Sequence, residues 1–189
     1  MKTPWIMSDT LSSWTYPGME GKPVVVEVYA PGDETELLLN GKSLGKNETG
    51  KNTDYMTTFE TIYEPGRLEA VTYQYGEELG RSCVMTAEPD TKLHLEVETG
   101  IEKELIFIHI SNRDRNGTIH TQKETALTCQ IEGDADVWFG SGTPKPENSY
   151  LDHVTRTWNG KALLVLRKRK KDSVNISVGS ETEKVEVVV

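Results

Sequence analysis

The stretch Leu93-His94-Leu95-Glu96-Val97-Glu98 places an apolar residue at every second position and a polar residue after each. The same alternation recurs at residues 127–132 and 173–178. Because successive side chains of a strand point to opposite faces of a sheet, a period of two predicts strands with one buried and one solvated face. The second half of the chain is therefore expected to be built from half-buried strands.

The first half of the chain carries a similar pattern. Val24, Val26 and Val28 share one face of a predicted strand, and further strands are expected near residues 34–40, 55–63, 68–75 and 81–87. No long segment has a convincing apolar stripe of helical period. Many short strands separated by turns predict an all-β chain of two tandem immunoglobulin-like antiparallel β-sandwiches. The turn pairs, which supply positive φ, are Asn40-Gly41, Pro65-Gly66, Tyr75-Gly76, Asn116-Gly117 and Asn159-Gly160.

A break in the alternation divides the chain. Residues 87–92 read Ala-Glu-Pro-Asp-Thr-Lys, and a fresh strand opens at Leu93. We therefore predict a first sandwich over residues 1–91 and a second over residues 92–189, each close to the roughly 100 residues of an immunoglobulin-like domain. Residues 8–21 lack a strand pattern and are expected to form an irregular arm before the first long strand.

Charge and hydropathy exclude several classes of partner. The 189 residues include 21 Lys and Arg against 30 Asp and Glu, which gives a formal net charge of -9. Since binding to a nucleic-acid backbone needs clustered cations, no nucleic-acid partner is expected. The longest apolar runs fall far short of the roughly 18 residues of a membrane span, and Pro4, Ser8 and Asp9 interrupt any apolar signal core. We expect no membrane segment; the protein is either cytoplasmic or exported as part of a longer chain.

No catalytic apparatus is visible. Glycoside hydrolysis needs two carboxyl groups that face each other across a sugar bond, whereas acids such as Glu77 and Glu78 fall in turns or on outward faces. No nucleophile elbow, phosphate loop or Cys-x-x-Cys motif occurs. The four histidines lie singly without ligand spacing, so neither a metal nor a cofactor is expected. Cys83 and Cys129 are interpreted as inward-facing residues of different sandwiches, and we expect buried free thiols.

A dense run of charge, Arg167-Lys168-Arg169-Lys170-Lys171, follows an apolar segment at residues 162–166 and precedes Asp172. This position predicts a solvated hairpin tip. A contact with a polyanion is the alternative.

The aromatic residues are the remaining candidates for binding. Sugar-binding modules stack the apolar face of a pyranose on exposed rings, and Trp tolerates partial exposure. Trp14 and Tyr16, in the irregular arm, suit an interface with a neighbouring domain, and Trp138 and Trp158 are candidates for an interface or for sugar stacking. The alternative, which also holds for Trp5, is that the rings close the ends of the sandwiches.

Three motifs occur in order along the first half: WTYPGMEGKPV at residues 14–24, ETELLLNGKSLG at residues 34–45 and YEPGRLEAV at residues 63–71. Over residues 12–89 the chain thereby resembles the immunoglobulin-like domain that follows the catalytic barrel in bacterial β-galactosidases of glycoside hydrolase family 2. The remainder, from Leu93, resembles the further immunoglobulin-like domain that closes such enzymes. Where the family often carries a Gly-Asn-Gly-Asp turn, this chain reads Phe139-Gly140-Ser141-Gly142-Thr143 and lacks the Asp.

The resemblance implies a parent enzyme that cleaves terminal β-galactosides with retention, using a Glu within an Asn-Glu pair and a Glu nucleophile on a (β/α)₈ barrel of about 250 residues. The one Asn-Glu pair here, Asn47-Glu48, is placed in a Gly-rich turn, so no catalytic residue is carried over. We expect a non-catalytic accessory region of a longer hydrolase, with the catalytic barrel as its partner and Trp14 and Tyr16 as anchors. The alternatives are an autonomous module that binds a β-galactoside or another glycan, and an adhesin-like spacer.

Overall fold

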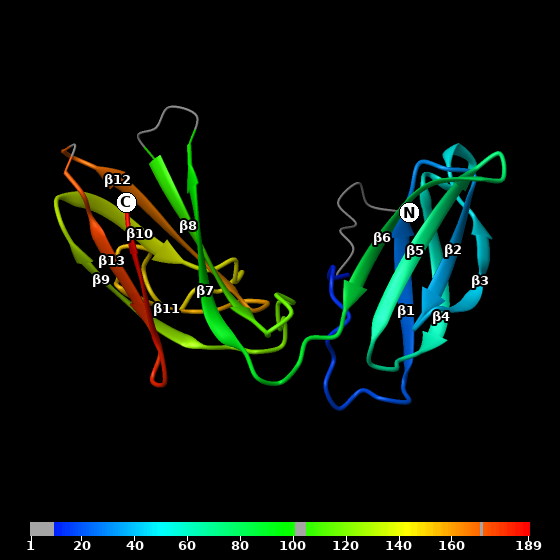
Figure 1. The fold of residues 1–189 in the computed structure, drawn as a ribbon, viewed down its shortest axis with the longest axis horizontal. Helices are drawn as coiled ribbons and strands as arrows, with labels where there is room; N and C mark the ends of the chain where they lie inside the picture. Colours follow the sequence, from blue (N-terminus) through cyan, green and yellow to red (C-terminus); the bar gives the residue numbers. More distant parts are fainter. Residues whose placement is uncertain (1–9, 101–104, 171) are drawn as a thin grey trace. The chain divides into compact units, whose positions relative to one another are not determined.

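A computed structural model describes residues 10–100, 105–170 and 172–189 (Figure 1). The chain forms two compact units that divide between Thr86 and Ala87. Within the described ranges every regular segment is a strand except one short 3-10 turn, η1 (Lys51–Thr53), and every sheet is antiparallel. The expected all-β fold of antiparallel sandwiches is confirmed, while the division after residue 91 stays a prediction.

The first unit packs a two-stranded sheet, β1-β4, against a four-stranded sheet of order β3-β2-β5-β6. Leu37 and Leu68 of the larger sheet and Phe59 of the smaller one are buried in a shared core. The alternation expected at Val24, Val26 and Val28 holds, because these side chains pack against that core. The strands are β1 (Pro23–Tyr29), β2 (Glu34–Leu39), β3 (Lys42–Glu48), β4 (Met56–Ile62), β5 (Arg67–Gln74) and β6 (Glu77–Met85).

The second unit is a sandwich of two four-stranded sheets, of order β10-β12-β8-β7 and β11-β9-β13-β14. Ile108 of β8, Leu164 and Leu166 of β12 and Val178 of β13 are completely shielded from solvent. They form one core between the two sheets. The strands are β7 (Lys92–Thr99), β8 (Leu105–Arg113), β9 (Ala126–Glu132), β10 (Ala135–Gly140), β11 (Val154–Arg156), β12 (Lys161–Lys168), β13 (Asn175–Gly179) and β14 (Lys184–Val188).

The sequence suggested that the basic run forms the tip of a hairpin, and this prediction is wrong. The run ends β12, which lies in one sheet, and the chain then crosses to β13 in the other. Arg167 pairs with Asp136 of β10 at 2.9 Å, Arg169 bonds the same carboxylate, and Lys170 pairs with Asp134 at 3.0 Å. The hydrogen bonds from Arg169 and Arg167 lower the pKa of Asp136. Asp134 and Asp136 therefore neutralise much of the positive charge of the run. Lys171 lies outside the described residues.

The two thiols differ in environment, and the inward orientation predicted for Cys83 is wrong. Cys83 is exposed, whereas Cys129 is buried and only 3% accessible. On β6, Val84 packs against the core opposite Leu68, so its neighbour Cys83 points outward opposite Glu69. Burial raises the pKa of Cys129 to about 11, because an apolar environment disfavours the thiolate.

Thiol titration of the folded chain at pH 8 should therefore detect one reactive cysteine, because the thiolate is the nucleophile and Cys129 is both shielded and protonated. Cys129 should react only after unfolding in urea, or as the pH approaches 11. The variant Cys83→Ser is the control and should abolish the fast reaction. Two fast-reacting thiols in the native chain would contradict this assignment.

Candidate functional site

The structure separates the four aromatic candidates by burial and places two in each unit. Trp14 is only 2% exposed, whereas Trp158 is 39% exposed. Tyr16 and Trp138 are half-buried. Trp5 lies outside the described residues. These environments decide which rings have a face available to a ligand.

Trp14 ties the irregular arm to its own unit. Its indole Nε1 donates to the carbonyl of Glu64 at 2.9 Å, and its carbonyl accepts from the hydroxyls of Tyr63 and Thr86. The rings of Trp14 and Tyr63 pack edge to face with centroids 4.9 Å apart. With both the ring and the indole N–H engaged, Trp14 presents no open face for stacking on a sugar.

Tyr16 extends the same aromatic cluster toward the surface. Its ring lies 5.7 Å from that of Tyr63, and its backbone N–H donates to the Tyr63 hydroxyl at 3.1 Å. Burial, and after it the neighbouring Tyr63, raise the pKa of Tyr16. Tyr16 thus remains a candidate for an interface, with part of its surface accessible.

Trp138 lies on β10 of the second unit, next to the charged side chain of Arg167. The guanidinium carbon of Arg167 lies 5.8 Å from the ring centroid, within the range of a cation–π contact. Arg167 is at the same time held by Asp136. Trp138 is therefore already engaged within its sheet.

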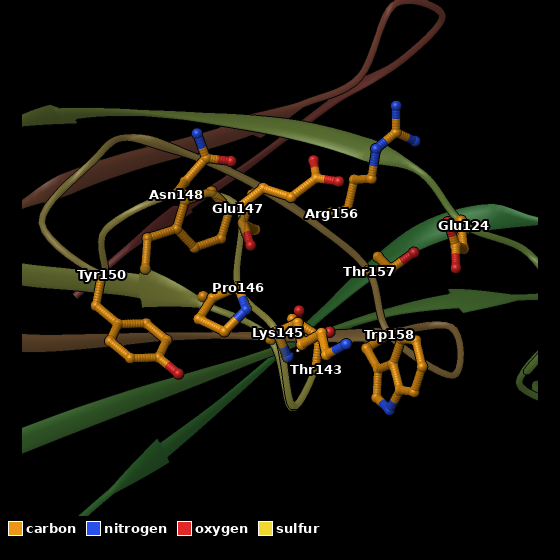
Figure 2. Close-up of a pocket in the computed structure, with 14 residues that line it drawn as sticks. Glu124, Thr143, Lys145, Pro146, Glu147, Asn148, Tyr150, Arg156, Thr157 and Trp158 are labelled. Carbon is orange, nitrogen blue, oxygen red and sulfur yellow. Dashed lines mark hydrogen bonds between the residues drawn. The ribbon is translucent and has the colours of Figure 1, made fainter.

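Trp158 borders a cavity of about 150 Å³ in the second unit. Figure 2 shows Tyr150 at one end and Trp158 at the other, with Thr143, Lys145 and Pro146 between them. The lining comes from the end of β10, the long connection at residues 141–150, the segment around Glu124 and the end of β11 with the residues after it. The complete lining is Glu124, Phe139, Gly140, Ser141, Thr143, Lys145, Pro146, Glu147, Asn148, Tyr150, Thr155, Arg156, Thr157 and Trp158.

A tight turn holds Trp158 in place. Asn159 and Gly160 have φ angles of 50° and 71°, as the predicted Asn-Gly turn requires. Trp158 and Lys161 exchange two backbone hydrogen bonds, at 2.8 and 3.0 Å, across this turn. A Cβ at Gly160 would lie 2.6 Å from the carbonyl oxygen of His120, so the turn packs closely against a neighbouring loop. The ring is therefore presented from a fixed backbone.

A buried polar network lies beneath the cavity. Thr157, which is 1% exposed, accepts from the backbone N–H of Thr125 at 2.8 Å and donates to the carbonyl of Lys123 at 3.2 Å. The amide of Asn112 donates to the same carbonyl at 3.2 Å and to the Thr125 hydroxyl at 3.1 Å. Because a buried polar group without a partner is costly, this network fixes the segment carrying Glu124 relative to Trp158.

Tyr150 is 50% exposed, and its position depends on a glycine. A Cβ at Gly140 would lie 2.4 Å from a ring carbon of Tyr150, so the ring packs directly on the backbone of β10. The carbonyl of Tyr150 also accepts from the N–H of Phe139 at 2.7 Å. The segment Phe139-Gly140-Ser141-Gly142-Thr143, where the resembled family often carries an Asp, thus forms one side of the cavity.

The charged groups around the cavity are balanced and unpaired. The lining has two acidic side chains, Glu124 and Glu147, and two basic ones, Lys145 and Arg156. Among the described residues none of these four side chains has an ion-pair partner, although ion pairs are frequent elsewhere in this unit. Figure 2 shows Glu147, Asn148 and Arg156 along one rim, with Tyr150 and Trp158 along the other. The cavity therefore offers aromatic faces together with free donors and acceptors.

Sequence reasoning found one of these lining residues, Trp158, and missed Tyr150 and the polar rim. The available signal was the long, proline-containing connection after Gly140, since long loops on a rigid scaffold often carry function. Asn47 and Glu48, expected in a turn, end β3 instead. There the Asn47 amide donates to the Thr58 carbonyl at 2.8 Å and Glu48 accepts from Asn52, which gives the pair a structural role.

The described part of the chain contains no cluster of three or more His, Cys, Asp or Glu side chains arranged to hold a metal ion. None of its segments forms a helix with the length and apolarity that crossing a membrane requires.

The sequence matches known families over most of its length. Residues 96–188 match the family described as glycoside hydrolase family 2 C-terminal domain 5. Residues 21–80 match a domain of unknown function, DUF4982. The cavity lies within the first of these matches.

Two relatives are much longer than this chain. A putative β-glucuronidase of Formosa agariphila is 34% identical over 158 residues, which cover 80% of this chain and 15% of that protein. A β-galactosidase of Bacteroides ovatus is 21% identical over 169 residues, which cover 86% of this chain and 18% of that protein. The chain thus spans less than a fifth of the length of these relatives.

Solved structures contain the same fold. A glycosyl hydrolase family 2 member from Bacteroides cellulosilyticus matches with a TM-score of 0.87 and 28% identity, over 95% of this chain and 26% of that chain. A β-glucuronidase from glycoside hydrolase family 2 matches with a TM-score of 0.83 and 19% identity, over 94% of this chain and 19% of that chain. The second match is a likeness of fold alone.

The variant Thr157→Val should destabilise the second unit by about 1–3 kcal/mol, because Val keeps the shape but leaves Asn112, Thr125 and the Lys123 carbonyl short of a partner. Urea denaturation of the 189-residue chain measures the change. Thr155→Val is the matched control: Thr155 is half-buried and its hydroxyl forms no bond to any described residue. Equal stability of the two variants would show that the network does not hold the site.

Proposed function

Because this chain belongs to the C-terminal domains of glycoside hydrolase family 2, we propose that it packs on the catalytic barrel of a longer enzyme and supports carbohydrate hydrolysis without catalysing it. The observation that carries this proposal is the fold itself. In the described ranges all regular structure is β apart from η1, whereas the catalytic carboxylates of (β/α)₈ enzymes lie at the ends of barrel strands. The accessory role also agrees with the small share of its relatives that the chain spans.

The cavity in the second unit does not provide an alternative active site. It contains two carboxyl groups, Glu124 and Glu147, but both side chains are exposed. A glycosidase general acid relies on burial to remain protonated near neutral pH.

Exposed apolar side chains on one face of the first unit, which also carries Glu27 and Glu60, support the proposed packing. Val25 of β1 and Met56 and Ile62 of β4 point outward from the two-stranded sheet and are 56%, 37% and 47% exposed. The larger sheet of the same unit instead carries ion pairs, such as Arg81 with Glu69 at 2.7 Å. Exposed apolar patches commonly mark protein interfaces. We therefore assign the outer face of β1 and β4, which we call the β1-β4 face, to the contact with the catalytic part.

The substrate proposed for the parent enzyme is a β-galactoside. The motifs of the first half support a β-galactosidase-like parent, and one relative is named a β-galactosidase. The alternative is a β-glucuronide, because the relative with the higher identity is named a putative β-glucuronidase. Assays of the longer enzyme with nitrophenyl β-galactoside and nitrophenyl β-glucuronide decide between them.

An autonomous carbohydrate-binding module is the second candidate function. The half-exposed Trp158 beside a cavity with unpaired polar groups favours it. This function is compatible with the accessory role, since one end of a sandwich can bind a glycan while another surface packs on an enzyme.

The isolated 189-residue chain should release no nitrophenol from either nitrophenyl glycoside, because it has no pair of shielded carboxyl groups in its described part. The measurement is absorbance over many hours at high protein concentration. The double variant Glu124→Gln with Glu147→Gln is the control for trace contamination. Turnover that the native chain shows and this variant loses would refute the non-catalytic assignment.

Within the longer enzyme, the double variant Val25→Glu with Ile62→Glu should lower the melting temperature of the catalytic part by several degrees, because it places charge in the proposed interface. Leu79→Glu is the matched control: Leu79 is 53% exposed and lies on the edge strand β6, outside the β1-β4 face. In the isolated chain both variants should melt like the parent sequence. An unchanged longer enzyme would reject the β1-β4 face as the contact.

A further inference from the structure

We infer that the cavity between Tyr150 and Trp158 binds one neutral pyranose ring of a glycan. The inference rests on the proposed function, since it assigns a ligand to a region of a carbohydrate-cleaving enzyme. It goes further by naming the residues that recognise the sugar and by predicting that acidic sugars are rejected.

The aromatic residues supply the apolar contact. Trp158 and Tyr150 are 39% and 50% exposed and border the same cavity. One face of a pyranose ring is a surface of C–H groups, which pack on the π-face of an aromatic ring, while its hydroxyls stay free to hydrogen-bond at the edge. Because Tyr150 and Trp158 stand at opposite ends of the cavity, each end offers one aromatic ring on which a sugar can pack.

The polar rim suits hydroxyl groups. Glu124 and Glu147 only accept hydrogen bonds, Lys145 and Arg156 only donate, and Asn148 does both. A sugar hydroxyl donates one hydrogen bond and accepts others, so adjacent hydroxyls can satisfy carboxylates and cations at the same time. Since these four charged side chains have no ion-pair partner among the described residues, their hydrogen-bonding groups are available to a ligand.

The charge balance selects against anionic ligands. Two carboxylates offset the two cations, so a uronic acid or a sulfated sugar would gain contact with Lys145 or Arg156 but approach Glu124 or Glu147 as well. Like charges at short range disfavour binding. The attraction and the repulsion offset each other, while a uronic acid must also give up the hydration of its own carboxylate. The rim therefore prefers a neutral pyranose over its uronic acid counterpart.

The size of the cavity limits the ligand to a single ring. Its volume of about 150 Å³ is well below the 300–1,000 Å³ typical of sites that enclose drug-sized ligands. One ring fits, and the rest of a glycan would extend into solvent. A site of this kind binds a chain end or a single projecting residue.

The backbone frame holds the two rings in place before a ligand arrives. Trp158 is fixed by the Asn159-Gly160 turn and by the buried bonds of Thr157, and Tyr150 packs on Gly140. Binding therefore requires little ordering of the backbone. Because ordering costs reduce affinity, a rigid frame makes a small contact area sufficient for measurable binding.

Titration of the 189-residue chain with methyl β-galactopyranoside, followed by isothermal titration calorimetry, tests the inference. We expect a saturable change, and methyl β-glucuronide should bind about tenfold more weakly or not at all. Trp158→Ala should weaken binding of the galactoside at least about tenfold. Trp138→Phe is the matched control, since it removes another tryptophan of the same unit outside the cavity, and it should retain affinity.

Gly140→Ala and Arg156→Gln keep the test decisive if Trp158→Ala fails to fold. The first displaces the Tyr150 ring and the second replaces a charged guanidinium of the rim with a shorter, neutral amide, so both should weaken the galactoside severalfold while circular dichroism stays unchanged. No saturable signal with the galactoside, or tighter binding of the glucuronide, would overturn the inference. Either result would leave the accessory role standing, because that role is tested by the melting of the longer enzyme.

Discussion

The alternation of side chains along the strands is the constraint on which the rest of the structure depends. Inward positions such as Ile108, Leu164 and Val178 are completely buried, and they form the core between the two sheets of the second unit. A sandwich built in this way leaves no interior space for chemistry, so functional groups can gather only on its faces or on its connections. The cavity beside Trp158 follows this rule, because most of its lining comes from the connection after β10 and from the residues that follow β11.

The period-two pattern was sufficient to predict the fold class, since it depends on local sequence alone. Val24, Val26 and Val28 face the core as expected, and Asn159-Gly160 adopts the positive φ angles of its turn. The pattern failed where few apolar residues define the inner face. On β6 only Val84 packs against the core, so Cys83 was assigned to the wrong side. A register shift that leaves Leu79 without a partner, between the pairs Thr72–Gly80 and Tyr73–Glu78, further disturbs the alternation of that strand.

The roles of the tryptophans could not be predicted because they depend on distant partners. Trp14 is buried through contacts with Tyr63, Glu64 and Thr86, which lie about 50 to 70 residues further along the chain. Trp158 has no comparable cover and remains half-exposed. Neither the burial of Trp14 nor the exposure of Trp158 can be predicted from the residues next to it in the sequence. The basic run was misplaced for a similar reason, since the crossing from β12 to β13 is a property of the sheet order and not of the residues that make the crossing.

The second unit separates the interactions that fold it from those available for recognition. Thr157 and Asn112 satisfy one another and the neighbouring backbone out of contact with solvent, so they contribute to stability whether or not a ligand is bound. Lys145 and Arg156 are exposed, and pairing them with nearby acids would add little stability because surface ion pairs are weak. Leaving them unpaired therefore costs the fold almost nothing, and it preserves four charged groups beside two aromatic rings. Substitution of these charged residues therefore changes the ligand preference of the rim without disturbing the buried network that holds the backbone in place.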